Sequence, residues 1–242
     1  MFTAKDVLDL WESGLVKTPL QRALDLLAAA YPELSFEQLK DLPIGQRDLR
    51  LMAVREALFG QRLTCLTNCP ACRERLELTL DVAQLRTTPL ESGLTETYLL
   101  TTEDYEIRFR LPNSEDLSQF AELADAGEAR RILFERCVQQ ARRDGVIVLA
   151  GELPEEIIQV TANRMAEIDP QADVQIALTC PACFQQWSAP FDIVSYLWIE
   201  INAWAVRLLH EIHRLASAYG WREADILALS PVRRQLYLEL IG

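Results

Sequence analysis

The residues with the clearest chemistry are two identical motifs, Cys69-Pro70-Ala71-Cys72 and Cys180-Pro181-Ala182-Cys183, with about 107 residues between them. Each CPAC motif offers two thiolates, half of the ligand set that a tetrahedral zinc ion takes. A CxxC turn places two sulfur atoms on one edge of such a tetrahedron, so that two turns complete it. We therefore expect Cys69, Cys72, Cys180 and Cys183 to bind one Zn²⁺ ion together.

A metal ion shared in this way is structural, because four cysteine ligands leave no coordination position open for water or substrate. Closing a loop of this length costs on the order of 4 kcal/mol of chain entropy. Structural zinc contributes roughly 10–16 kcal/mol in peptides. The ion is therefore sufficient to join two segments that are distant in sequence.

Other interpretations of the cysteines stay open. A thioredoxin-like redox motif follows a strand and opens a helix, whereas both CPAC motifs lead into strand-like or proline-containing sequence. Four thiolates also suit iron, and the motifs could persist as turns without a metal ion. Cys65 is either a spare ligand or, like Cys137, a small apolar side chain.

The remaining candidates for chemistry are weak. His210 and His213 are three residues apart, which differs from the HExxH spacing of metalloproteases, and we expect them on a polar helix face. The sequence has no glycine-rich phosphate loop, and its carboxylates, Asp116 among them, fit solvated helix faces. We therefore do not expect an enzyme.

The composition restricts the partners and the location. A net charge of −12 argues against nucleic-acid binding, which needs clustered lysine and arginine. The N-terminal residues lack the pattern of a secretory signal, and charged side chains interrupt the longest apolar region, Phe191 to Leu209, so we expect no membrane span. Six cysteines in such a chain indicate reduced thiols and synthesis in the cytoplasm.

The hydrophobic pattern predicts an α+β fold, mostly helical, in which a split zinc ribbon carries a mixed α/β insertion. Residues 1–60 form an N-terminal helical region. Its helices have N-caps at Thr3 and Thr18, a capping box of Ser35 with Gln38, and a last helix over residues 44–59 that stops at Gly60.

Residues 61–83 and 173–190 form the two halves of the split zinc ribbon. Apolar and polar residues alternate over 76–82 and 174–178, the period of half-buried strands. Each CPAC motif therefore lies in a turn between two strands.

The insertion, residues 84–172, contains a predicted hairpin of 98–100 with 105–111. Helices follow from Ser114, its N-cap, towards Ala126, from Arg130 to Arg142, and from Pro154 to Ile168. Residues 146–149 form a short extended segment.

A C-terminal helical arm covers residues 191–242. Apolar residues at steps of one, three or four predict a helix from Val194 to Tyr219, on the order of 40 Å long. Because this length exceeds a small core, we expect part of its tryptophan-rich stripe to contact a partner. Shorter helices follow at 223–229 and after Ser230-Pro231.

Three stretches together carry a family resemblance. The first runs from Leu42-Pro43-Ile44-Gly45-Gln46-Arg47-Asp48 into the first CPAC motif. The second runs from Ala166-Glu167-Ile168-Asp169-Pro170-Gln171-Ala172-Asp173 into the second motif and Phe191-Asp192-Ile193. The third is the tail around Tyr219-Gly220-Trp221. The chain resembles, over nearly its whole length, the baseplate hub and hub-assembly proteins of contractile-tailed phages and phage-tail-like contractile injection systems.

The resemblance implies a non-enzymatic structural or assembly protein that contacts other baseplate or hub proteins, the spike or the tube initiator. Only the four cysteines correspond to a site. Some relatives have glycine after the second cysteine of each motif, where this chain has Arg73 and Phe184, and such a position favours a left-handed backbone. The alternatives are a zinc-ribbon adaptor of another bacterial complex and a CxxC redox enzyme.

Overall fold

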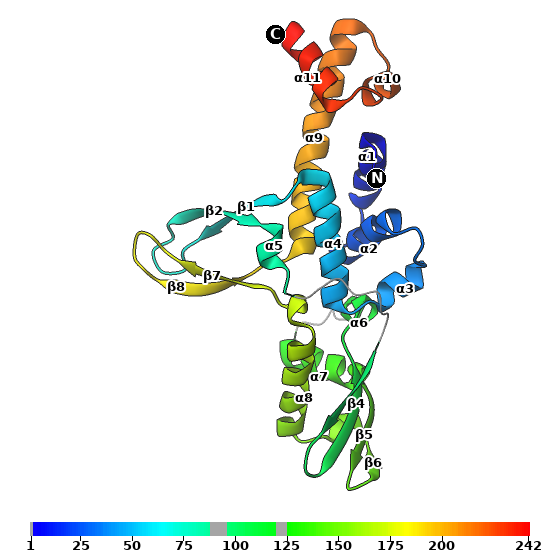
Figure 1. Ribbon diagram of the computed structural model, residues 1–242, viewed down its shortest axis with the longest axis vertical. Coiled ribbons are helices and arrows are strands. Elements are labelled where there is room, and N and C mark those ends of the chain that lie inside the picture. Colours follow the sequence, from blue (N-terminus) through cyan, green and yellow to red (C-terminus); the bar gives the residue numbers. More distant parts are fainter. Residues whose placement is uncertain (1, 88–95, 120–124) are drawn as a thin grey trace. The chain divides into compact units, whose positions relative to one another are not determined.

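The structure is a computed structural model that describes residues 2–87, 96–119 and 125–242 (Figure 1). Helices alternate with small antiparallel sheets, so the predicted α+β class is confirmed. The chain divides into two compact units, residues 1–26 with 194–242 and residues 27–193. Among the described residues, no helix has both the length and the hydrophobicity to span a bilayer.

The first unit is entirely helical in its described part. It contains α1 (Ala4–Gly14), the start of α2 (Pro19–Ala30), α9 (Ile193–Tyr219), α10 (Glu223–Leu227) and α11 (Pro231–Leu240). The predicted long C-terminal helix is therefore confirmed as α9. Its apolar stripe forms a core with α1, α10 and α11 through the buried residues Leu8, Ala205, Leu208, Ile212, Leu215, Ile226 and Leu238.

Gly14 permits a close contact within this unit. A Cβ atom at Gly14 would lie 2.4 Å from the ring of Trp198. The Arg22 guanidinium lies 4.3 Å from the centroid of the same ring, and its Nε donates a 2.7 Å hydrogen bond to the Gly14 carbonyl. Gly14 is therefore the last residue of α1, and its lack of a Cβ atom also leaves room for the indole ring of Trp198.

The second unit begins with the rest of α2 and with α3 (Phe36–Asp41) and α4 (Ile44–Phe59). The predicted capping box of Ser35 with Gln38 is confirmed at the start of α3. Gly60 follows α4 with a φ of +86°, a conformation that glycine adopts without strain.

Two hairpins follow from separate parts of the sequence, and both predicted strand pairs are confirmed. The first pairs β1 (Arg62–Asn68) with β2 (Arg75–Asp81) and leads into α5 (Val82–Leu85). The second pairs β7 (Gln175–Thr179) with β8 (Gln186–Pro190). The turn of each hairpin contains one CPAC motif.

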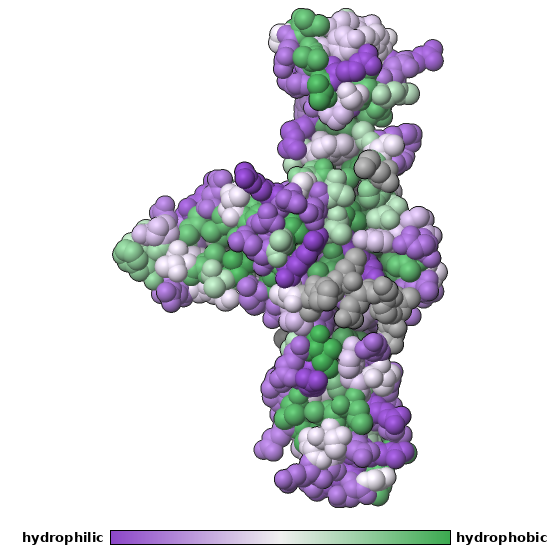
Figure 2. Space-filling view, in the orientation of Figure 1, coloured by the Kyte–Doolittle hydropathy of each residue, from purple (hydrophilic) through white to green (hydrophobic). Residues whose placement is uncertain are grey.

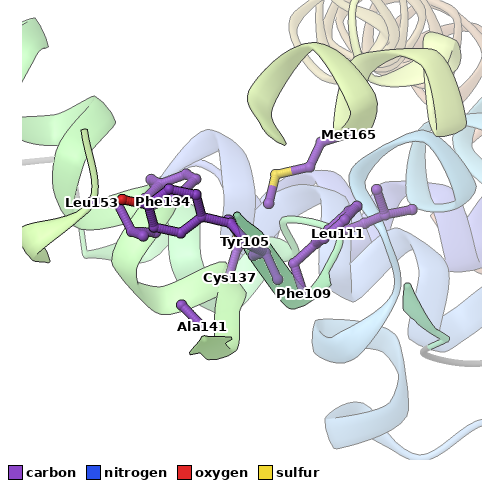
Figure 3. Close-up of a cluster of buried hydrophobic side chains, with 9 residues drawn as sticks. Tyr105, Phe109, Leu111, Phe134, Cys137, Ala141, Leu153 and Met165 are labelled. Carbon is purple, nitrogen blue, oxygen red and sulfur yellow. The ribbon is translucent and has the colours of Figure 1, made fainter. Parts of the chain in front are cut away.

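The insertion contains a four-stranded antiparallel sheet in the order β3-β4-β5-β6. Its elements are β3 (Thr97–Thr101), β4 (Tyr105–Arg110), α6 (Ser114–Ser118), α7 (Ala126–Cys137), β5 (Val138–Arg143), β6 (Val146–Val148), η1 (Ala150–Glu152), α8 (Glu155–Ile168) and η2 (Pro170–Ala172). Figure 3 shows part of its core, in which Phe109, Phe134, Cys137 and Met165 pack together.

The prediction of one helix from Arg130 to Arg142 is wrong. Helix α7 ends at Cys137, and the next six residues form β5 between β4 and β6. Ala141 pairs with Ile107 on one side and with Val148 on the other. Strand pairing and burial therefore override the local helical pattern, as is common for short segments.

The helix predicted from Ser114 is also corrected. Its N-cap is Asn113, whose side chain accepts a hydrogen bond from the Asp116 backbone, and the helix ends at Ser118. Asparagine and serine are comparable N-caps, and here the Asn113 side chain and the Asp116 side chain form a capping box one residue before the predicted start. Residues 120–124 of that prediction lie outside the described part.

The two ends of the insertion are joined by a glutamine. The Thr87 backbone N–H donates a 2.8 Å hydrogen bond to Gln171 Oε1, and Gln171 Nε2 donates a 3.1 Å bond to the Leu85 carbonyl. Gln171 is buried, so that these bonds are shielded from water. The chain thus leaves and re-enters the rest of the unit at one place.

Candidate metal centre

The first CPAC motif forms a tight turn that closes the β1–β2 hairpin. The Cys69 backbone N–H donates to the Glu74 carbonyl at 2.8 Å, and the Cys69 carbonyl accepts from the Arg73 N–H at 2.9 Å. Arg73 has a φ of +63°. We call residues 69–74 the first cysteine turn.

The second CPAC motif repeats this geometry between β7 and β8. The Cys180 N–H donates to the Gln185 carbonyl at 2.9 Å, and its carbonyl accepts from the Phe184 N–H at 2.9 Å. Phe184 has a φ of +58°. The left-handed conformation expected after the second cysteine is therefore confirmed in both turns, although neither residue is glycine. We call residues 180–185 the second cysteine turn.

The two cysteine turns face each other and bring four sulfur atoms together. The Sγ atoms of Cys69, Cys72, Cys180 and Cys183 all lie within 4.8 Å of one another. Cys69 Sγ is 3.6 Å from Cys183 Sγ, and Cys72 Sγ is 3.5 Å from Cys180 Sγ. Tetrahedral zinc with bonds of about 2.3 Å separates its sulfur ligands by about 3.8 Å. The donor set and its spacing thus fit a single ion.

Each turn contributes one buried and one exposed thiol. Cys69 and Cys180 are buried, whereas Cys72 and Cys183 are exposed. The buried pair packs with Leu76, and Trp187 covers the cluster from β8. Half of the donor set is therefore anchored in a small apolar core, and the other half faces the surface of the hairpins.

The four thiols influence one another's ionisation. Hydrogen bonds from the backbone N–H groups of Cys72 and Ala71 lower the pKa of the Cys69 thiol to about 6. At Cys72, the hydrogen bond from the Glu74 N–H also lowers the pKa of the thiol. The neighbouring thiols, Cys183 first, and desolvation outweigh this bond and raise the pKa of Cys72 to about 12. Several thiolates in this space therefore need a cation between them, which deprotonates coordinating thiols.

The other candidate residues lie elsewhere. Cys65 lies within β1 and is not part of the cluster. Cys137 is fully buried in the insertion core, and burial raises its pKa to about 12, so its interpretation as an apolar side chain is confirmed. His210 and His213 are exposed on α9, and His210 Nδ1 lies 2.8 Å from the Val206 carbonyl of the same helix.

Asp116 is not on a solvated face as predicted; its side chain is fully buried. It accepts hydrogen bonds from Arg110 at 2.6 and 2.8 Å and from Arg136 at 2.8 Å. Burial raises the pKa of the carboxyl group, but these cations and the Asn113 N–H outweigh it and hold the pKa below its ordinary value. The Asn113–Asp116 capping box is the sequence signal that locates this carboxylate.

Together, the helices and hairpins define an α+β protein whose candidate site is a cluster of four cysteines on two matched turns. Residues 2–198 match the protein family described as T4 bacteriophage base plate protein, and the chain belongs to this family. The matched region contains all four cysteines and the whole insertion. The resemblance to baseplate proteins of contractile tails is therefore confirmed. No curated protein and no solved structure matches the chain.

Proposed function

We propose that this protein is a non-enzymatic structural or assembly component of the baseplate hub of a contractile phage tail or a phage-tail-like contractile injection system. The family match over residues 2–198 carries the proposal. The stretches around Gly45 and Asp169, two parts of the hub resemblance, are in contact through a 2.9 Å hydrogen bond, which supports a common scaffold.

In this proposal one zinc ion has a structural role. Cys69 and Cys72 hold it from the first hairpin, and Cys180 and Cys183 hold it from the second. The spacing of the sulfur atoms supports tetrahedral coordination. With four protein ligands the ion binds neither water nor substrate, so it fixes the hairpins and takes no part in catalysis.

The partners in this proposal are other hub proteins, the spike or the tube initiator. The chain binds them in the bacterial cytoplasm while the tail is assembled. The tryptophan-rich stripe, part of which we expected to contact a partner, packs largely into the core of the first unit. Several apolar side chains elsewhere on α9 face solvent, which supports a partner contact along the helix from Val194 to Tyr219; they are Ile199, Val206 and Leu209. The net charge of −12 is unfavourable for nucleic acid as a partner.

Deletion of the gene from a tail-producing strain tests the hub assignment. We expect electron microscopy to find few or no complete contractile tails, and a plasmid copy of the gene to restore them. A deletion strain that makes the normal number of full tails would overturn the assignment. Affinity purification from cells that express the whole tail gene cluster should recover baseplate proteins with the tagged chain.

A further inference from the structure

Helix α11 has one side that packs against the first unit and one side that faces solvent. Leu238 is buried in the core of the unit. Arg234 is also buried, and it donates hydrogen bonds to Glu211 at 3.1 Å and to the Leu229 carbonyl at 2.9 Å. These contacts fix which side of the helix is exposed.

The exposed side of α11 is an apolar stripe. Val232, Leu236 and Leu240 are 70%, 55% and 76% exposed, and their spacing of four residues places them one above another on one helix face. Arg233 flanks them on one side and Glu239 on the other, where it accepts a hydrogen bond from its own helix. Figure 2 shows green, apolar residues over α11. We call the three apolar residues the α11 stripe.

The same unit contains an apolar groove between α1, α9 and α10. Its volume is about 900 Å³, at the upper end of the range for binding pockets. The polar residues of its lining are all exposed, so none of the described lining is an inward polar group of the kind that orients a small ligand. The groove therefore suits apolar side chains of a protein segment. Its apolar lining residues are Leu8, Trp11, Leu209, Ala224, Leu227 and Ala228.

The groove and the stripe carry opposite unpaired charges. Glu12 on α1 and Glu223 on α10 line the groove, and neither has a side-chain partner among the described residues. The third carboxylate of the lining, Asp9, is already paired with Lys5 at 2.5 Å. Arg233 is exposed at the edge of the α11 stripe and likewise lacks a partner within the described part of the chain. The two surfaces are therefore complementary in both hydrophobicity and charge.

We propose that the α11 stripe of one chain packs into the groove of a second copy of this chain. The aliphatic side chains of the stripe enter the apolar groove, and Arg233 lies against Glu12 and Glu223. The two surfaces differ, so the contact is heterologous, and successive copies form a closed ring or an open chain.

This self-association does not depend on the hub assignment. The α11 stripe lies beyond residue 198, where the family match ends. The inference rests on the groove, the stripe and their charges, which all belong to the first unit. Its tests use the purified chain alone, so their failure leaves the hub assignment untouched, and failure of the gene-deletion test leaves the self-association untouched.

The apolar part of the contact is tested by analytical ultracentrifugation. We expect the average mass of the wild type to rise with protein concentration. Leu236→Ser should weaken the association at least tenfold, because a buried leucine contributes more than the 1.4 kcal/mol that corresponds to that factor. Val16→Ser, at a side chain of the same unit that is 93% exposed and outside both surfaces, should associate like the wild type. A wild type that keeps the mass of one chain up to about 1 mM, or an association that Leu236→Ser leaves unchanged, would overturn the proposal.

The charged part of the contact is tested by exchange. Arg233→Glu reverses the stripe, and the double variant Glu12→Lys with Glu223→Lys reverses the groove. Each alone should associate at least tenfold more weakly, because like charges then face each other. An equimolar mixture should recover the association, since each stripe then finds a groove of opposite charge. Arg207→Glu, an exposed reversal on α9 outside the groove, should change nothing.

The mixture distinguishes the proposed contact from damage to the fold. These charged side chains are exposed, and we expect every variant to melt within about 4 °C of the wild type. A fold damaged by either set of substitutions would stay damaged in the mixture. A mixture that associates no better than its two components would therefore overturn the pairing of the α11 stripe with the groove.

Discussion

The backbone N–H of Gly45 donates a 2.9 Å hydrogen bond to the carboxylate of Asp169, 124 residues later in the chain. Gly45 lies in the first turn of α4, whose N-cap Pro43 makes no side-chain capping bond. A helix N-terminus carries unpaired N–H groups and a partial positive charge. Asp169 therefore caps α4 from the far end of the insertion.

Replacing Gly45 by alanine should separate this pair. The new Cβ would lie 1.8 Å from Asp169 Oδ1, so the carboxylate must move and the buried N–H loses its partner. We expect the free energy of unfolding to fall by about 3 kcal/mol, measured by urea titration.

Gly151→Ala is the matched control. Its Cβ would meet only the end of the Glu135 side chain, which can move away. Equal urea midpoints for Gly45→Ala and Gly151→Ala would show that Asp169 is not held against the helix.

Removal of the metal tests the cysteine cluster. We expect the purified protein to contain one zinc per chain, and Cys180→Ser to lose it together with several degrees of Tm, because the buried Cys180 anchors the second cysteine turn. Atomic absorption and thermal unfolding measure both effects. Cys65→Ser should retain the zinc, since Cys65 is outside the cluster. Metal-free wild type that melts at the same temperature as the zinc form would refute a structural role.

Stability should depend on pH through Asp116. Its pKa is lowered in the folded state, so it stabilises the protein above its unfolded pKa, about 3.9. That contribution is lost progressively as the pH falls below about 4. Urea titrations between pH 2.5 and 7 should show this decline.

Asp116→Asn should be about 3 kcal/mol less stable at pH 7, because Arg110 and Arg136 lose their charged partner, and its stability should change less below pH 4. Glu103→Gln, an exposed change in the β3–β4 turn, should follow the wild-type curve. A curve for Asp116→Asn that parallels the wild type would contradict the assignment.

Gly14 and Trp198 should be energetically coupled. Alanine has a higher helix propensity than glycine by about 1 kcal/mol, so Gly14→Ala would stabilise an uncrowded helix. We expect a loss of about 2 kcal/mol instead, because the new Cβ meets the indole ring. In a double-mutant cycle, Trp198→Leu should recover much of that loss. If the effects of the two substitutions on the free energy of unfolding are strictly additive, the Trp198 ring does not restrict the side chain at position 14.

The features that follow from the sequence are those encoded by neighbouring residues. The capping box of Ser35 with Gln38 and the strands on either side of each CPAC motif depend on residues at most a few positions apart. The identity of the two CPAC motifs also suggests that they meet, because each has half of a ligand set. Local patterns and one chemical rule thus predict the candidate site.

The remaining features depend on contacts between distant residues. Considered by themselves, residues 138–143 have a helical pattern. They form β5 because β4 and β6 supply hydrogen-bonding partners on both sides. Asp116 resembles a surface carboxylate until Arg136, 20 residues later, folds onto it. The capping of α4 by Asp169 has no local signal at all, since Gly45 alone is compatible with many structures.

The bonds of Gln171 to Leu85 and Thr87 have a consequence for how the protein can vary. Because the insertion starts and finishes at one point, the cysteine turns depend on where its two ends are held and not on how much chain lies between them. Helix α4 also contacts the interior of the insertion, where the Ile44 N–H donates a 3.0 Å hydrogen bond to the Pro112 carbonyl. A homologue could therefore carry a longer, shorter or different lobe there without repositioning the hairpins. Such a change would alter the surface of the insertion and leave the cluster of four cysteines unchanged.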